Sequence, residues 1–386
     1  MCYRFILPII VLLLACNGKN KEQDGTLTLY PLQNSHAIKD FSPYVESVEV
    51  IPLETTDSSL IANPSKIIIT PEGNFVVNDA SRILVFSPEG KFLFKIGKQG
   101  RGPREYLGCI DICISGNGKE LLILDIQGHV LRHKLSDGTH VETVYLNTPE
   151  KYTSPYGVCP APGEGFYIFF CNPDNDTDFE NDFYCLLQFD KTGTNMAQYL
   201  PRKEYVLQVE MITQSFDSQY IIRPTSTDNI IYKTSEKGPY PFIKIDFEKK
   251  GMPHHLAMPQ REEGFNLRNY MAAPYYKLPI YIHDTPDHLY FACCNPEIKN
   301  MNLLFNLKTG KGISWEYNPE NDGTLFKIMA SDRHYFYGLH DDYDNYDNSR
   351  IRQIKDPLKR YILQKTNLNL KNENQNPALI KLKFKS

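Results

Sequence analysis

Three aspartates at alternate positions, Asp174, Asp176 and Asp178, form the pattern in this chain that comes nearest to a metal site. Alternating carboxylates are typical of calcium loops, because calcium prefers several oxygen ligands from closely spaced residues. Phe179, however, stands where an EF-hand loop needs glycine, and no glutamate closes the loop. The pattern therefore favours a solvated loop. Calcium is the one cofactor left open, and no other is predicted.

A second acidic stretch, HDDYDNYDNS, mixes carboxylates with aromatic rings. After His340 it continues with Asp341, Asp342 and Tyr343, and these residues could bind a cation or stack on a sugar. A plain exposed loop of the same composition is the alternative. We take the three residues as candidate ligand-binding residues.

The third candidate is the segment KQGRGPREY, with Arg101, Glu105 and Tyr106. Its glycines allow two backbone segments to approach closely, and its polar groups then need partners. Two interpretations remain open. Arg101 and Glu105 form an ion pair that fastens a connection between structural units, or the three side chains bind a ligand.

Other reactive side chains form no recognisable set. His254, His255 and Arg261 have no third ligand nearby in sequence, and Cys109 and Cys113 have metal-like spacing without a second Cys or His pair. No GxSxG, HExxH, Walker or dinucleotide-binding motif is present. The sequence therefore leaves open whether the protein is an enzyme and makes a non-enzyme the better prediction.

The first residues predict export. Phe5 to Leu14 is an apolar run about half as long as a membrane-spanning helix, which fits the core of a signal peptide. It ends in Leu13-Leu14-Ala15-Cys16, which resembles a bacterial lipobox. We predict a lipoprotein signal peptide over residues 1–15, lipid on Cys16 and a polar tether over residues 16–43. An ordinary secretory peptide with an incidental Cys16 is the alternative.

Composition limits the class of protein. The chain has 386 residues, of which 41% are hydrophobic and 23% charged, as in a globular protein. Its net charge of −4 gives no reason to expect binding to nucleic acid. Without Cys2 and Cys16, an odd number of cysteines remains, which argues against a complete disulfide framework and leaves the state of Cys293 and Cys294 open.

The elements that must position these residues repeat along the chain. A turn followed by an apolar run recurs at steps of 46, 45, 54, 69 and 46 residues, beginning at Phe75, Leu121, Phe166, Tyr220, Leu289 and Tyr335. A second run then ends in a turn with glycine, which allows the positive φ that such turns require. Four apolar runs about every 45 residues indicate the blades of a propeller rather than separate sandwich domains.

The predicted fold is an all-β, six-bladed β-propeller over residues 44–386. The sixth unit contains a short helical insertion, RIRQIKDPLKRYILQKT, before the C-terminal run NPALIKLKF. The run Val45 to Leu53 has no unit of its own, and a ring should leave no sheet edge open. We therefore expect the N-terminal and C-terminal strands to close the last blade side by side.

Long connections should gather on one face of this ring. In a four-strand meander, the loops between the second and third strands lie on the same face as the connections between blades. Four segments take such positions: KQGRGPREYLG, CNPDNDTDFEND, 248–275 and 340–375. Long loops on a rigid frame often carry function, so we expect this face to bind a partner.

Three segments carry a family resemblance: KFLFKIGKQGRGPREY, VEVIPLET and NPALIKLK. Together they resemble the six-bladed β-propeller lipoproteins of Bacteroidetes, relatives of the NHL-repeat propellers. The resemblance implies a lipid-anchored propeller of the cell envelope at the outer membrane, on its periplasmic or cell-surface side, attached to the membrane by its lipid alone. It implies no defined reaction. We predict a binding module for a glycan, a peptide or an envelope protein. A metal-dependent hydrolase or lyase with its site in the central channel is the alternative.

Overall fold

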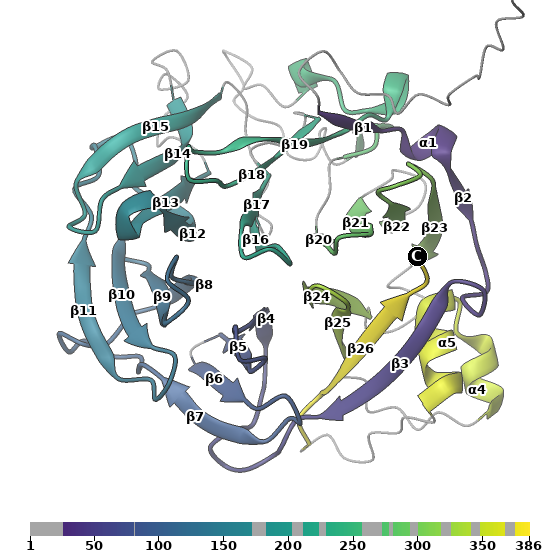
Figure 1. Cartoon of the computed structure of the whole chain (residues 1–386), viewed down its shortest axis with the longest axis horizontal. Coiled ribbons are helices and arrows are strands. Elements are labelled where there is room, and N and C mark those ends of the chain that lie inside the picture. The colour runs from purple at the N-terminus through teal and green to yellow at the C-terminus, as the bar shows by residue number, and fades with distance from the viewer. Residues whose placement is uncertain are drawn as a thin grey trace, which may run out of the picture.

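The computed structural model forms a ring of six β-sheets around a central axis (Figure 1). It describes residues 26–80, 82–171, 183–202, 211–223, 229–256, 272–277, 281–293, 300–317, 326–340, 348–366 and 375–386. Each sheet contains one of the six repeats predicted from the sequence. The six-bladed propeller is therefore confirmed.

In each blade the strands follow one another from the channel outward in an antiparallel meander. Blade 1 consists of β4 (Pro64–Ile69), β5 (Phe75–Asp79), β6 (Arg82–Phe86) and β7 (Phe92–Ile96). Blade 2 consists of β8 (Cys109–Ile114), β9 (Glu120–Asp125), β10 (His129–Lys134) and β11 (His140–Tyr145). Blade 3 consists of β12 (Pro155–Ala161), β13 (Gly165–Phe170), β14 (Phe183–Phe189) and β15 (Asn195–Arg202).

The second half of the ring has additional outer strands. Blade 4 contains β16 (Ile212–Gln214), β17 (Tyr220–Ile222), β18 (Ile230–Lys233) and β19 (Tyr240–Ile245), with β1 (Leu27–Leu29) outside. Blade 5 contains β20 (Tyr281–Asp284), β21 (His288–Cys293), β22 (Asn300–Asn306) and β23 (Gly312–Tyr317), with β2 (Ser35–Ala37) outside. Blade 6 contains β24 (Lys327–Ser331), β25 (Phe336–His340), β26 (Ala378–Phe384) and β3 (Val45–Pro52).

The two ends of the chain close blade 6. β3 pairs antiparallel with β26 from Val45 opposite Phe384 to Pro52 opposite Ala378, and it is the outermost strand. At the far end of this strand, the backbone passes close to the β6–β7 turn of blade 1. A Cβ added to Gly90 would lie 2.1 Å from the carbonyl oxygen of Pro52. Glycine is therefore required where the closing strand meets the first blade.

The turn glycines behave as the sequence analysis expects. The five that end the turns between third and fourth strands all have positive φ, between +68° and +111° (Gly90, Gly138, Gly193, Gly238 and Gly310). These turns lie on what we call the turn face. The opposite face, with the loops between second and third strands and the connections between blades, is called the loop face.

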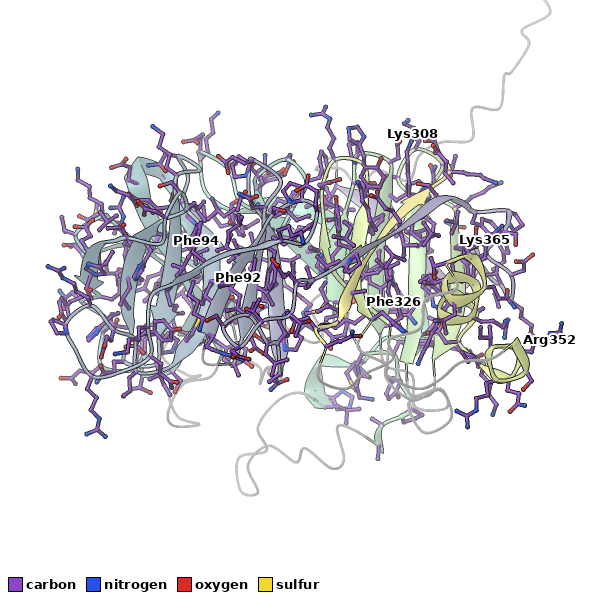
Figure 2. The ribbon with its side chains drawn as sticks, turned by 90° about the horizontal axis from the view of Figure 1, so that it is seen from below. Phe92, Phe94, Lys308, Phe326, Arg352 and Lys365 are labelled. Carbon is purple, nitrogen blue, oxygen red and sulfur yellow. The ribbon has the colours of Figure 1, made fainter. Side chains whose placement is uncertain are left out.

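Figure 2 shows the two faces from the side, with Lys308 of a turn on the upper face and Arg352 of the helical insertion on the lower face. That insertion contains two helices, α4 (Asn348–Gln353) and α5 (Pro357–Thr366). Asp356 accepts hydrogen bonds from the backbone N–H groups of Leu358 and Lys359 at 2.9 and 3.2 Å, and Pro357 follows it. This cap begins a new helix and divides the single helical segment predicted from the sequence.

The predicted tether over residues 16–43 is wrong in its second half. β1 pairs in parallel with β19, α1 (Pro31–Asn34) follows, and β2 pairs in parallel with β23. Figure 1 shows this segment along the outside of blades 4 and 5. We call residues 26–43 the outer strap. Its two strands have three residues each and lack a turn signal, so their periodicity is too short to be recognised.

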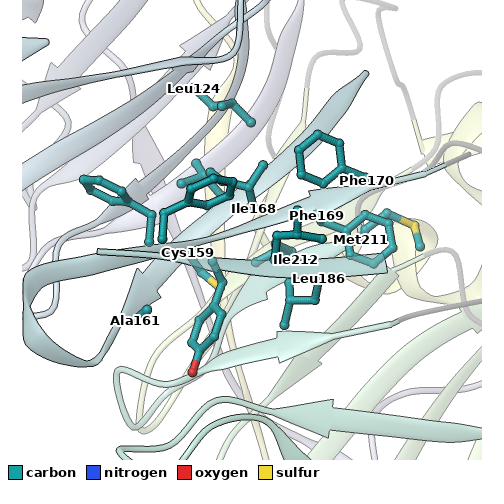
Figure 3. Close-up of a cluster of buried hydrophobic side chains, with 14 of the residues drawn as sticks. Leu124, Cys159, Ala161, Ile168, Phe169, Phe170, Leu186, Met211 and Ile212 are labelled. Atoms are coloured by element: carbon teal, nitrogen blue, oxygen red, sulfur yellow. The ribbon is translucent and has the colours of Figure 1, made fainter. Parts of the chain in front are cut away.

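Apolar side chains fill the spaces between neighbouring blades. The largest cluster joins blades 2, 3 and 4, and Figure 3 shows its core around Ile168, Phe169 and Leu186. Met211 and Ile212 of blade 4 belong to the same cluster. Among the described residues, no helix is long and apolar enough to cross a membrane.

Candidate functional site at the channel

The central channel holds two cavities, one on each face. The turn-face cavity has a volume of ≈ 380 Å³, and its described lining carries hydroxyl and amide groups together with Asp332, but no lysine or arginine. Asp332 accepts hydrogen bonds from the backbone N–H groups of His334 and Tyr335, at 2.7 and 2.8 Å, and from the Tyr337 hydroxyl at 2.6 Å. Its carboxylate thus stabilises its own turn.

The loop-face cavity has a volume of ≈ 420 Å³ and a different lining. Every blade contributes to it, with Lys66, Asp111, Tyr156, Ile212, Tyr281 and Lys327 from blades 1 to 6 respectively. Charged or aromatic side chains from five blades, and apolar side chains from blade 4, thus line one cavity. This is the arrangement of a ligand site on a rigid scaffold.

Repeated β-bulges shape this cavity. In blades 1, 2 and 3 the pairing of the innermost strand shifts register near its first residues. The residues skipped by the shift are Ser65, Ile110 and Tyr156, and all three line the cavity. A bulge redirects a side chain and interrupts strand pairing, so the repeat places an unpaired residue at the same height in three blades.

A buried ion pair forms the floor. The Lys66 Nζ atom donates hydrogen bonds to Asp111 Oδ1 at 2.7 Å and to the Ile212 carbonyl oxygen at 3.0 Å. It therefore crosses the channel from blade 1 to blade 4. The side chains of Lys66 and Asp111 are only 7% and 11% exposed. Such a pair costs desolvation energy, which good hydrogen-bond geometry must offset.

The remaining lone pairs of Asp111 are also used. Its Oδ1 atom accepts a second hydrogen bond from the Ile112 N–H, and Oδ2 accepts one from the Val158 N–H, each at 2.9 Å. Gly157 makes the last contact possible, because a Cβ there would lie 3.4 Å from Asp111 Oδ2 and 3.0 Å from Ile212. Asp111 is therefore a structural carboxylate that joins blades 1, 2 and 3.

The cation of blade 6 is held differently. The Lys327 Nζ atom lies 3.9 Å from the ring centroid of Tyr281, a cation–π contact. Among the described residues, Lys327 has no carboxylate within ion-pair distance. It is half-buried and lines the cavity, so its charge faces the space that a ligand would occupy.

Behind the cavity lining lies a histidine without exposed surface. His283 of β20 is 0% exposed, and neither of its ring nitrogens has a hydrogen-bond partner of good geometry in the described structure. Burial, with the charges of Lys327 and Lys66, lowers the pKa of His283 to about 3, and the Ile328 backbone offsets this only partly. The ring is neutral at pH 7.

The lowered pKa of His283 predicts how the stability of the protein changes in acid. Between pH 6.5 and about 3 the unfolded chain protonates His283 and the folded chain does not, so stability falls as the pH falls. The loss attributable to His283 should approach about 1.4 kcal/mol per pH unit. Chemical denaturation of His283→Phe should show a shallower acid loss than the parent chain, whereas replacing exposed His334 should not. If the free energy of unfolding fell equally with pH in the parent chain and in His283→Phe, protonation of His283 would not contribute to the acid loss.

The structure assigns internal contacts to the loop around Arg101. Glu105 accepts a hydrogen bond from the Gly102 N–H at 2.9 Å and forms an ion pair with Lys98 at 3.1 Å. The Gly102 contact, first, and Lys98 lower the pKa of the Glu105 carboxyl. The predicted Arg101–Glu105 pair is thus replaced by Lys98–Glu105, because the turn directs Glu105 toward its own backbone.

Tyr106 belongs to the core between blades 1 and 2 and is 1% exposed. Burial raises the pKa of its hydroxyl. Arg101 is exposed and Glu105 is partly exposed, so a ligand can reach these two from solvent. A ligand role for Arg101, Glu105 and Tyr106 remains a prediction.

Several other predicted residues lie outside the described part of the chain. They are Cys16, Cys294, Asp174, Asp176, Asp178, Arg261, Asp341, Asp342 and Tyr343. His255 is exposed on a short 3₁₀ turn (His254–Leu256). The described cysteines form no disulfide, and all but Cys109 are buried, as the apolar strand positions suggest.

Sequence reasoning missed the residues that line the cavity. Lys66 within the apolar run KIII and Asp111 within CIDICI were not among its candidate residues. The available signal was a single charged residue inside each apolar run. Such a residue is costly in a core and must either be paired or face a channel.

The alternative hydrolase or lyase would need a set of metal ligands, and the described residues do not supply one. The described residues contain no group of three or more His, Cys, Asp or Glu that could hold a metal ion. The cavity itself offers two ammonium groups and a carboxylate whose oxygens are already bonded. Ammonium groups repel a cation, so this lining does not suit a divalent metal.

Comparison with known proteins places the chain in a family. The model of a domain of unknown function, DUF4934, matches residues 31–383, which is nearly the whole propeller. The chain belongs to the DUF4934 family. The match begins inside the outer strap, so residues 31–43 of the strap are part of the family domain. No curated protein matches the chain in sequence.

A crystal structure from Bacteroides fragilis, named "Putative exported protein", shares the fold with a TM-score of 0.73 and 18% identity, over 93% of this chain and 99% of that one. A Xanthomonas campestris gluconolactonase gives 0.43 and 10%, over 91% and 94% of the two chains. The Neurospora crassa Pan2 WD40 domain gives 0.39 and 10%, over 83% and 75%. The last two are too distant to support any argument. The first shows that this DUF4934 propeller shares its fold with a Bacteroides protein.

Proposed function

We propose that this DUF4934 protein is a lipid-anchored binding module of the cell envelope. Its ligand, a glycan, a peptide or a segment of an envelope protein, occupies the loop-face cavity. The observation that supports this best is that all six blades contribute to that one cavity. The sheets are held by interblade cores, so the site is formed before a ligand arrives.

The chain's first residues support the envelope location. An apolar run precedes Cys16, and the Bacteroides fragilis protein that shares the fold carries a name that describes it as exported. In this proposal, acyl chains on Cys16 hold the propeller at the outer membrane, on its periplasmic or cell-surface side. The propeller itself does not enter the bilayer.

The cavity chemistry supports recognition better than catalysis. General acid–base catalysis near neutral pH most often uses a carboxyl or imidazole group that reaches the substrate. The oxygens of Asp111 are occupied by the three donors that give it its structural role, and His283 does not line the cavity. The described lining thus combines charges and aromatic rings without a free carboxyl or imidazole group, which suits binding.

The test uses residues 17–386, which contain every strand of the six blades. This chain should bind a subset of a glycan and peptide array. Tyr156→Ala with Tyr281→Ala should abolish that binding, whereas Lys308→Ala on the turn face should not. No array signal, or a signal unaffected by the tyrosine changes, would exclude the loop-face site. Metal analysis with lactone and polysaccharide assays would detect the alternative enzyme.

The anchor is tested separately in the full chain. Metabolic labelling with an alkyne fatty acid should mark the parent protein in the membrane fraction, and Cys16→Ser should lose the label. An unlabelled parent protein would exclude lipid attachment without affecting the ligand site.

A further inference from the structure

The loop-face cavity contains a positive charge that the described protein does not neutralise. Lys66 is paired with Asp111 at 2.7 Å, whereas Lys327 has only the ring of Tyr281 at 3.9 Å. Lys233, another buried lysine, lies 2.8 Å from Asp284. Lys327 has no such carboxylate among the described residues, and a half-buried cation that faces a cavity favours an anionic occupant.

Asp111 cannot serve as that anion. Its two oxygens already accept hydrogen bonds from Lys66, Ile112 and Val158 within 2.9 Å. The neutral state of His283 agrees with this charge balance, since Lys66 and Lys327 both disfavour its protonation. The described lining of the cavity thus keeps an excess of one positive charge.

The rest of the lining matches a hydroxyl-rich ligand with apolar faces. Tyr156 and Tyr281 are half-buried and supply ring surface and hydroxyl groups. Asn78 also lines the cavity and is 3% exposed. A sugar ring matches this lining, because its hydroxyls can bond the tyrosine hydroxyls and its apolar face can lie against their rings. A peptide side-chain carboxylate would pair with Lys327 but would offer the tyrosine hydroxyls few further partners.

We propose that the loop-face cavity binds an acidic sugar, whose carboxylate pairs with Lys327 and whose ring lies against the tyrosines. This inference rests on the proposed binding function and names its ligand class. A volume of ≈ 420 Å³ is within the range of small-ligand pockets. The sugar hydroxyls exchange hydrogen bonds with the tyrosine hydroxyls.

The test is calorimetric titration of residues 17–386 with three probes: digalacturonic acid, its methyl ester and a glutamate-containing tripeptide. The acid should bind, and the ester, which lacks the charge, should bind about 10- to 100-fold more weakly, the range for loss of a charge-assisted hydrogen bond. The tripeptide should bind no better than the ester.

Two lysine variants locate the site. Lys327→Met should weaken the acid about 10- to 100-fold and leave the ester unchanged, and Lys327→Arg should restore part of the affinity. Lys381→Met is the matched control, because Lys381 belongs to the same blade and lies 4.3 Å from the Tyr335 ring, outside the cavity lining. It should bind the acid like the parent chain. Unchanged thermal unfolding of each variant shows that its fold is intact.

The opposite outcomes separate the two proposals. Equal binding of acid and ester, preferential binding of the tripeptide, or no effect of Lys327→Met would overturn the acidic-sugar proposal. If array ligands still depended on Tyr156 and Tyr281, the binding module itself would stand. If the preference for the acid and the dependence of array binding on the two tyrosines were both absent, the acidic-sugar proposal and the binding-module proposal would both be overturned.

Discussion

Lys66→Ala should destabilise the propeller by about 3–5 kcal/mol, the usual cost of leaving one member of a buried ion pair without its partner. Asp111 would keep its charge in a site where its side chain is only 11% exposed. The substitution would also remove the contact from blade 1 to the Ile212 carbonyl of blade 4 across the channel. Equilibrium chemical denaturation measures this loss.

The matched control is Lys383→Ala. Lys383 lies 2.7 Å from Glu46, the same distance as in the buried pair, but both side chains are well exposed. Solvent screens such a pair, so the control should change stability little. Adding Asp111→Asn to Lys66→Ala should recover part of the loss, because the uncompensated charge is removed. Similar small effects for Lys66→Ala and Lys383→Ala would show that the channel floor contributes little to stability.

Phe41→Ala should cost about 3–5 kcal/mol, as for other large-to-small changes in a protein core. Phe41 is 0% exposed, and its ring meets that of Trp315 edge-on at 4.9 Å. It also lies 6.4 Å from the rings of Tyr361 and Phe384, so it joins blade 5, α5 and blade 6. Chemical denaturation should show a lower midpoint with an unchanged slope.

The control is Met196→Ala, because Met196 is 61% exposed on β15 and should be replaced at little cost. A Phe41→Ala variant as stable as the parent would mean that residues 16–43 are a tether, as the sequence alone predicts. The outer strap would then be a loosely attached segment.

The fold was predictable because its determinants are local. Each blade repeats apolar runs and a turn glycine, and Gly90 and Gly310 have the positive φ that the pattern requires. The unpaired run at Val45 also predicted closure, since a sheet edge needs a partner. β1 and β2 were not predictable, because strands of three residues pair with edges contributed by distant parts of the chain.

The site was harder to predict because its geometry arises from long-range contacts. Lys66 reaches Ile212, far along the chain, and the bulge that exposes Tyr156 depends on strand pairing rather than on sequence pattern. Glu105 and Tyr106 were recognised as unusual for a sound reason, but their groups serve the loop and the core. A polar motif of this kind indicates that its groups need hydrogen-bond or ion-pair partners. The fold itself can supply those partners.

The central claim is that the loop-face cavity is the ligand site of this DUF4934 propeller. A crystal structure of residues 17–386 with digalacturonic acid, or with the glycan selected on the array, tests it most directly. Density should fill the cavity, with a carboxylate within hydrogen-bond distance of Lys327 Nζ and a ring against Tyr156 or Tyr281. Ligand density in the turn-face cavity or on the outer wall, with the loop-face cavity empty, would contradict the claim.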